Sequence, residues 1–489
     1  MTRTTRFTLS ALALAVSLVS QSVLAQDDVP ADQQALTELE ALANETAQPY
    51  DLPSLPGLFV QALRHDADLT RQRLELAATR EEVPMARSQL LPQVTASGGY
   101  LWQDSTNLQT VDEIDQFGNT ARPAEIDETY YQIQLQQPLF SLERWRQMGV
   151  AEAQVSAAEL QLAVVEQELA LQVSEAYIKA YLAAQRLGLL ESQQASLDLQ
   201  VRQANRAFEL GIGNRVDLLE AQSRFDQAVS DAVEAENELD NALSELERLT
   251  GLTPRFEGTA PNELTTVVLS GDFSNPDEWV ARTGQNLNVL LAQEEQQITQ
   301  ADTGVRRSGY YPELNLNLSY SDRASDDPIR ESEDYRASVE LSVPIYRGGY
   351  TNASVRQGEK RIEAGLAAVD NERNLAIQEV RQRIRALNGG ERRLKALNQA
   401  ISSSQLFLEA AEKGEQLGLR DLVDVLDARA SLYDQRIQYV DVVGNYALDM
   451  LALHSAVGSL ESNDLDRIMA LLASLSMSSQ SMSSQVAQQ

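Results

Sequence analysis

Two periods of apolar and polar residues alternate along this chain of 489 residues. Four stretches alternate residue by residue, which is the period of a strand with one apolar and one polar face. These stretches are 93–102, 131–136, 313–320 and 338–345. The sequence around them follows the helical period of about 3.6 residues. The pattern therefore predicts two strand hairpins set among helices, an α+β fold.

The stretches that follow each hairpin predict very long helices. Residues 143–209 contain no proline, so at about 1.5 Å per residue the helix would be on the order of 100 Å long. In the matching stretch, 355–415, Gly389 predicts a local break. Helices of this length do not fit inside a globule, so we expect a long bundle or tube. The first of the shorter helices carries a coiled-coil seam over four heptads, formed by Phe225, Ala228, Ala232, Ala235, Leu239, Ala242, Leu246 and Leu249.

The two halves of the chain repeat each other. Both contain a turn with a central glycine between two apolar residues, and in both a second glycine follows 40 residues later. Glycine permits a tight reversal between helices, and exposed apolar residues at the end of a tube predict a docking site. Ordinary helix-hairpin turns are the alternative. The turn residues are Leu210, Gly211, Ile212, Leu417, Gly418 and Leu419, and the second glycines are Gly251 and Gly458.

The N-terminus predicts export. Arg3 and Arg6 precede a short apolar stretch, and Ala25 ends a small-residue cleavage site, as in a signal peptide. A buried N-terminal helix is the alternative. The expected organisation is a signal peptide (1–25), a flexible leader (26–56), a first repeat (57–253), a linker (254–272), a second repeat (273–460) and a low-complexity disordered tail (461–489). Each repeat is expected to run helix, hairpin, long helix, tip turn, helix.

Composition excludes several classes of site. The net charge of −32 argues against nucleic acid, because phosphate binding needs a basic face. The same charge fits either a solvated surface or a cation-favouring lumen. The chain has no cysteine, which removes disulfides, thiol catalysis and zinc–thiolate sites. We interpret His65 and His454 as structural, so we expect no metal and no cofactor. No nucleophile elbow or phosphate loop appears, which disfavours a hydrolase.

Aromatic residues flank the four strands, and each strand has one apolar face, which is typical of an outer-membrane barrel. An ordinary two-layer sheet with a soluble core is the alternative. Four strands cannot close a barrel, because single-chain barrels start at about eight strands and open edges are not tolerated in lipid. The pattern therefore requires an oligomer, and it leaves two chains or three chains open.

Short motifs in both halves match one family in order. They are Ala86-Arg87-Ser88 with Leu90-Leu91-Pro92, the stretch Val343 to Gly349, the stretch Val423 to Ala428, and Glu238 to Leu243 continued by Leu249 to Gly251. Each motif is weak alone, but together they span about 57–460. The chain resembles TolC-like outer-membrane ducts of efflux and type I secretion systems.

The resemblance implies an architecture and a function. It implies a homotrimer with a 12-stranded β-barrel in outer-membrane lipid, four strands per chain, continued by a periplasmic α-helical coiled-coil barrel. Such a duct is not an enzyme. It passively conducts small molecules or unfolded polypeptide, and it works with a periplasmic adaptor (a membrane fusion protein) and an inner-membrane pump or ABC transporter. The alternative is an adhesive coiled-coil surface protein with a trimeric barrel anchor, which the internal repeat disfavours.

The resemblance also assigns residues. Asp424 and Asp427 correspond to an acidic ring at the periplasmic entrance, and their spacing puts both carboxylates on one helix face. Asp217 and Arg420 correspond to positions that hold the tips closed. Glu415 stands where better-known members have tyrosine, so we hypothesise that Arg420 is shared between Asp217 and Glu415. The two glycine turns would meet the adaptor.

Overall fold

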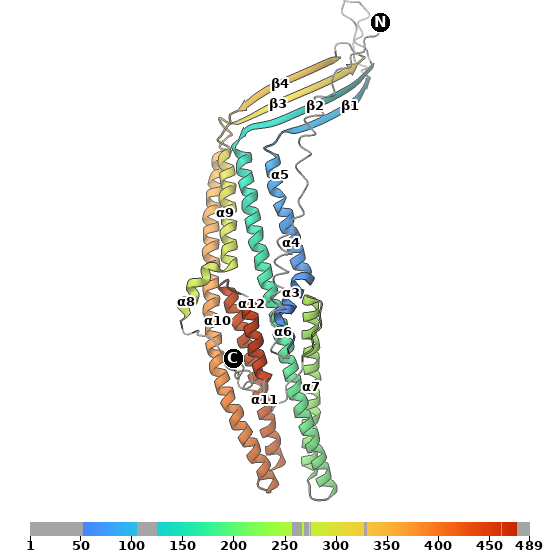
Figure 1. Ribbon diagram of the computed structural model, residues 1–489, viewed down its shortest axis with the longest axis vertical. Helices are drawn as coiled ribbons and strands as arrows, with labels where there is room; N and C mark the ends of the chain where they lie inside the picture. Colours follow the sequence, from blue (N-terminus) through green and yellow to red (C-terminus); the bar gives the residue numbers. More distant parts are fainter. Residues whose placement is uncertain are drawn as a thin grey trace, which may run out of the picture.

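The computed structural model describes residues 52–104, 125–256, 267, 273, 275–326, 330–460 and 462–476. The molecule is elongated, with a sheet at one end and two helical hairpin tips at the other (Figure 1). The predicted signal peptide lies outside the described residues, as do most of the predicted leader and most of the linker.

The strands form one antiparallel sheet in the order β1-β2-β3-β4. Its two central strands, β2 and β3, come from different repeats, so the sheet joins the two halves of the chain. Within the described residues, β1 and β4 each pair on one side only. The strands are β1 (Gln93–Asp104), β2 (Glu125–Ser141), β3 (Glu313–Ser325) and β4 (Ser332–Ser342).

The register aligns apolar residues in rows across the sheet. Val94 lies opposite Leu135, Leu135 opposite Leu318, and Leu318 opposite Ala337. Because successive side chains point to opposite faces, these rows collect on one face. That face is open in the single chain, where the exposed fraction is 64% for Val94 and 38% for Leu318. The sequence prediction of one apolar and one polar face is confirmed.

Two predicted strand ends were wrong. The second strand was predicted to end at 136, before Pro138, but β2 continues to Ser141 with a register shift between Pro138 and Phe140. Proline has no N–H for the ladder, and this bulge accommodates it. Val343 and Ile345 alternate like strand residues, yet β4 ends at Ser342. The intervening Pro344 again lacks a donor.

Long helices run from the sheet to the tips. The predicted helix 143–209 is confirmed, since α6 spans 68 residues without interruption. The one helix predicted at the start of the first repeat, before its hairpin, is instead three segments, with Asp66 capping the N-terminus of the second. A short 3₁₀ turn, Arg282–Gln285, precedes α9. The α-helices are α3 (Leu55–His65), α4 (Ala67–Arg80), α5 (Glu82–Ser88), α6 (Leu142–Glu209), α7 (Arg215–Thr250), α8 (Pro276–Ala281), α9 (Leu287–Ser308), α10 (Tyr350–Gln416), α11 (Leu422–Ala456) and α12 (Ser462–Ser476).

The break predicted at Gly389 is absent, because α10 is continuous through both of its adjacent glycines. Each glycine costs a helix roughly 1 kcal/mol relative to alanine. Burial of Leu387 and Leu394 on either side offsets that cost. Gly390 faces α11, where a Cβ would lie 3.4 Å from the ring of Tyr446, an ordinary van der Waals contact.

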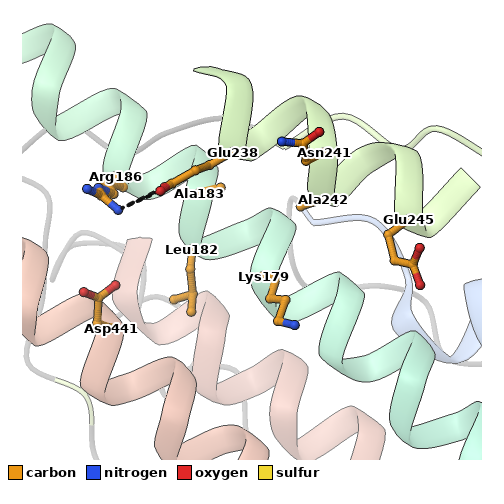
Figure 2. Close-up of a pocket in the computed structure, with 9 residues that line it drawn as sticks. All are labelled: Lys179, Leu182, Ala183, Arg186, Glu238, Asn241, Ala242, Glu245 and Asp441. Atoms are coloured by element: carbon orange, nitrogen blue, oxygen red, sulfur yellow. Dashed lines mark hydrogen bonds and ion pairs between the residues drawn. The ribbon is translucent and has the colours of Figure 1, made fainter. Parts of the chain in front are cut away.

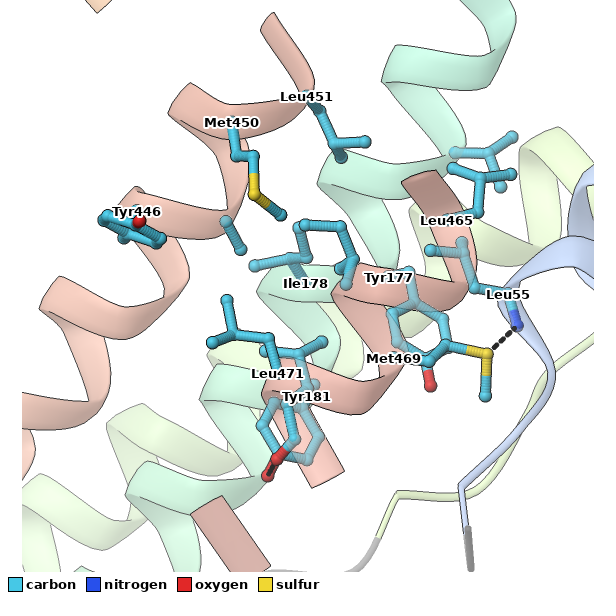
Figure 3. Packing of buried hydrophobic residues seen from close by; sticks show 14 of the residues in the cluster. Leu55, Tyr177, Ile178, Tyr181, Tyr446, Met450, Leu451, Leu465, Met469 and Leu471 are labelled. Carbon is cyan, nitrogen blue, oxygen red and sulfur yellow. Dashed lines mark hydrogen bonds between the residues drawn. The ribbon is translucent and has the colours of Figure 1, made fainter. Parts of the chain in front are cut away.

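The main apolar core lies midway along the molecule (Figure 1) and contains residues of α3, α4, α6, α7, α10, α11 and α12. Figure 3 shows part of its packing. Tyr177 and Tyr181 of α6 are fully buried there. Their hydroxyls donate to the main-chain oxygens of Pro53 and Leu472, each at 2.8 Å. We call this cluster the central core.

The central core corrects the predictions for both termini. The stretch 461–489 was expected to be disordered, but α12 is a helix whose Ile468 and Leu472 are fully buried in the core. Its apolar residues recur at helical spacing, a signal that the Ser- and Met-rich end of the tail obscured. The leader was expected to reach 56, yet Leu55 begins α3 and is fully buried, and its N–H lies 3.3 Å from Met469 Sδ. Residues 477–489 lie outside the described residues.

Among the described residues, no helix is long and apolar enough to cross a membrane.

Candidate functional site

The first hairpin tip joins α6 to α7 by a tight turn. Gly211 has φ = +76°, the left-handed region that favours glycine. The N–H groups of Ile212 and Gly213 both donate to Ala207 O, at 3.1 and 3.0 Å. Asn214 then caps α7, because its side chain accepts from Val216 N at 3.0 Å. The turn is therefore a helix-ending motif followed at once by an N-cap.

The second tip, between α10 and α11, repeats this geometry. Gly418 has φ = +69°. The N–H groups of Leu419 and Arg420 both donate to Gly414 O, at 2.8 and 3.2 Å. Asp421 caps α11 by accepting from Leu422 N at 2.8 Å. The repeat seen in the sequence thus produces two matching turns, and both glycines stand where the sequence predicts the reversal.

Apolar side chains project from both turns. The exposed fraction is 81% for Ile212, 73% for Leu417 and 78% for Leu419. Leu210 is also exposed, at 59%. Burial of such side chains in a partner would be favourable, at about 25 cal/mol per Å² of apolar surface. The tips of the single chain therefore expose apolar surface, and docking of a partner there stays a prediction.

The two predicted ring carboxylates lie on the first turns of α11, and both are paired. Asp424 Oδ2 lies 3.4 Å from Arg420 Nη1. Asp427 Oδ1 lies 2.6 Å from Arg224 Nη2, on α7. The side chains of Asp424 and Asp427 are 48% and 59% exposed. Within one chain the acidic face is thus partly neutralised.

The hypothesised sharing of Arg420 does not occur within one chain. Arg420 pairs with Asp424, and its guanidinium lies 5.5 Å from the centre of the Phe407 ring. Among the described residues, no ion pair joins Arg420 to Asp217 or Glu415. Glu415 contributes its main-chain oxygen to the turn, accepting from Gly418 N at 2.9 Å. Contacts of these residues with neighbouring chains stay a prediction.

Sequence reasoning missed two arginines near the tips. Arg224 crosses from α7 to α11 to reach Asp427. Arg429 crosses from α11 to Glu412 on α10, at 2.5 Å, and donates to Ser196 on α6. Neither position belongs to the motifs that carry the resemblance. A possible signal was charge, because an arginine that faces a neighbouring helix of an acidic protein is expected to find a carboxylate.

A hollow of about 450 Å³ lies farther up, where α6, α7 and α11 meet (Figure 2). Arg186 Nη1 and Glu238 Oε2 pair at 2.9 Å across it. Asp441 faces the hollow from α11, and burial, the largest cause, raises the pKa of its carboxyl. Lys179 and Glu245 pair with residues of their own helices. The hollow is therefore a gap in the packing of the hairpins, lined by two cationic and three acidic side chains.

Among the described residues, no group of three or more His, Asp or Glu side chains is arranged to hold a metal ion.

Comparison with known proteins decides the family. The model of the family described as outer membrane efflux protein matches residues 58–252 and 283–459, which is most of the chain. The chain belongs to the outer membrane efflux protein family. The matched ranges contain both hairpin tips and all four strands, so the family assignment rests on the elements described above.

Relatives of this chain include outer membrane proteins and a protease secretion protein. The chain is 29% identical to the outer membrane protein TolC of Vibrio cholerae, covering 84% of this chain and 92% of the relative. It is 27% identical to the alkaline protease secretion protein AprF of Pseudomonas aeruginosa, covering 84% and 85%. The crystal structure of the Campylobacter jejuni CmeC outer membrane channel aligns with a TM-score of 0.70, at 16% identity, over 88% and 91%. The chain is accordingly an outer-membrane channel of the TolC type.

Proposed function

We propose that three copies of this chain form one passive duct that conducts small molecules or unfolded polypeptide through the outer membrane. The sheet is the observation that carries the proposal. It has an exposed apolar face suited to lipid and unpaired edges at β1 and β4. Lipid does not tolerate open edges, so β4 of each chain pairs with β1 of the next. Three chains close a barrel of twelve strands, continued by the helices as a tube.

The duct has no energy source of its own in this proposal. An inner-membrane pump or ABC transporter supplies the energy, and a periplasmic adaptor connects it to the duct. The adaptor docks on the two glycine turns, where Ile212, Leu417 and Leu419 are exposed. The proposed role is transport, with no chemical step and no cofactor. Asp424 and Asp427 of the three chains surround the entrance and favour cations.

Cysteine cross-linking tests the assembly, because the chain has no cysteine of its own. We would place Thr95→Cys in β1 together with Ser338→Cys or Glu340→Cys in β4 and oxidise the membranes. The expected result is a ladder that ends at three chains on a non-reducing gel. A matched control is Gln134→Cys with Ser319→Cys, which face each other within one sheet and so give no ladder. A ladder that ends at two chains, or none, contradicts the proposed trimer.

Conductance measurements test the proposed role of Asp424 and Asp427 at the entrance. Single channels of the wild type in a planar bilayer should be small and cation-selective, and divalent cations should block them. Asp424→Asn with Asp427→Asn should lose that block, because the carboxylates that hold the cation are gone. A correctly assembled oligomer that never conducts, with or without adaptor, would favour the adhesive coiled-coil alternative.

A further inference from the structure

Arg224 lies between carboxylates of two different hairpins. Its Nη2 is 2.6 Å from Asp427 Oδ1 on α11 and 3.7 Å from Glu220 Oε1 on its own helix. Glu220 and Asp427 occupy the same place in the two repeats, nine residues after Gly211 and Gly418. One guanidinium thus bridges equivalent acidic positions of the two halves of the chain.

Arg429 connects the two hairpins from the other side, because it lies on α11 and reaches α6. From α11 it pairs with Glu412 on α10 and donates to Ser196 on α6. Its side chain is only 14% exposed, so solvent screens this pair less than it screens the Arg224 pair. Charge-assisted hydrogen bonds of this kind are stronger than neutral ones. Arg429 therefore ties α11 to both of the long helices at this level.

The apolar contact between the hairpins is small where the two arginines act. Leu197, Ala228 and Leu426 are its buried members. A hollow of about 170 Å³ adjoins them, and both Arg224 and Arg429 line it. Because apolar packing is limited here and adjoins a hollow, polar contacts contribute a larger part of the stability of the contact between the hairpins.

The repeat is broken at these two positions. The counterpart of Arg224 in the second repeat is Ser431, thirteen residues after the tip glycine, and the counterpart of Arg429 in the first repeat is Gln222. Each hairpin thus supplies one arginine that the other lacks. Arg224 joins the hairpins through Asp427, and Arg429 joins them through Ser196. The ion pair of Arg429 with Glu412 lies within the α10–α11 hairpin.

We propose that Arg224 and Arg429 latch α11 onto the α6–α7 hairpin in the closed entrance, and that Arg224 in addition sets ion selectivity by neutralising Asp427. The inference rests on the proposed function, because it concerns the entrance of the same duct. The half-exposed Arg224–Asp427 pair is the one that opening breaks first. Its loss would return one negative charge per chain to the entrance.

Thiol labelling tests the latch without any need for conduction. Ala228→Cys places the only thiol of the chain at the contact between the hairpins, where Ala228 is 2% exposed. Adding Arg224→Gln and Arg429→Gln should raise the labelling rate by a maleimide at least several-fold in the assembled protein. Arg206→Gln is the matched control, because Arg206 pairs with Glu209 inside α6. Equal labelling rates in the double variant and the control would overturn the latch. Leu426→Cys serves as the reporter if Ala228→Cys does not assemble.

Reversal potentials in a salt gradient separate the two arginines. Arg224→Gln should increase cation selectivity and strengthen block by Mg²⁺, because Asp427 loses its counter-charge. Arg224→Lys should retain wild-type selectivity, and Arg429→Gln should leave selectivity unchanged. Unchanged selectivity in Arg224→Gln would overturn the role of Arg224. If no assembled variant conducts, the proposed duct fails, while the labelling rates still decide whether the latch exists.

Discussion

In the middle of the molecule, Tyr177, Tyr181 and Leu387 are fully buried among seven helices, whereas the contact between hairpins near the tips rests on Leu197, Ala228 and Leu426. The same long helices build both regions. The central core adds α3 and α12, which pack against α6 and α11. Near the tips, α10 and α11 share a small apolar cluster, and arginines supplement the few apolar side chains between the hairpins. Regions with few buried apolar contacts open at lower free energy. The contrast indicates that the tips can rearrange while the centre stays folded.

Removal of α12 should have the largest effect on this contrast. A chain that ends at 460 loses Ile468, Leu472 and Leu475, all fully buried. Each such side chain contributes roughly 1.5–3 kcal/mol by burial, so we expect little or no folded protein. A chain that ends at 476 keeps α12 and should accumulate normally. The measurement is the amount of folded oligomer in the membrane, and normal accumulation of the shorter chain would show that α12 is dispensable.

Tyr181→Ala should rank next. It leaves a cavity in the central core and removes the hydrogen bond to Leu472 O, so we expect a loss of about 3–5 kcal/mol. Tyr181→Phe keeps the packing and should cost only about 1–3 kcal/mol, for the acceptor left without its donor. Thermal unfolding followed by circular dichroism should place the midpoints in the order wild type, Phe, Ala. Equal midpoints for the two variants would mean that the hydroxyl, not the ring, carries the stabilisation.

A matched pair of glycines gives the smallest but most direct contrast. Gly458, beside the central core, and Gly418, at a tip, both have positive φ. A Cβ at Gly458 would lie 2.0 Å from Gln285 O, whereas nothing lies within 4 Å of one at Gly418. Gly418→Ala should therefore cost only the left-handed strain of about 1–2 kcal/mol, and Gly458→Ala should cost more. Equal unfolding midpoints for the two variants would contradict the comparison.

Much of the fold could be predicted because apolar and polar residues keep a regular spacing over long stretches of the chain. The alternation around Leu314 to Tyr320 and the proline-free stretch over 143–209 each specify an element without help from the rest of the chain. The strand ends at Pro138 and Pro344 were harder, since whether proline ends a strand or causes a bulge depends on the neighbouring strand. Folding of the segment 462–476 into α12 depends on a surface that is distant in the sequence, namely the buried sides of α3 and α6.

The candidate site was predictable only in part. Gly211 and Gly418 indicate the turns, because few other residues adopt positive φ. The partner of Arg420 could not be read from the sequence, since Asp424 one turn along competes with Asp217 and Glu415. Arg224 and Arg429 acquire their importance from helices packed side by side, a relation that no local pattern contains.

Hydrogen exchange of the assembled protein, followed residue by residue or peptide by peptide, tests the central claim most directly. The account predicts that amides of 408–430 and 197–232 exchange orders of magnitude faster than those of 173–181 and 443–457. It also predicts that Arg224→Gln with Arg429→Gln speeds exchange near the tips and leaves the centre unchanged. Uniform exchange along the helices, or equal acceleration in both regions, would show that tips and centre open as one unit and would contradict the account.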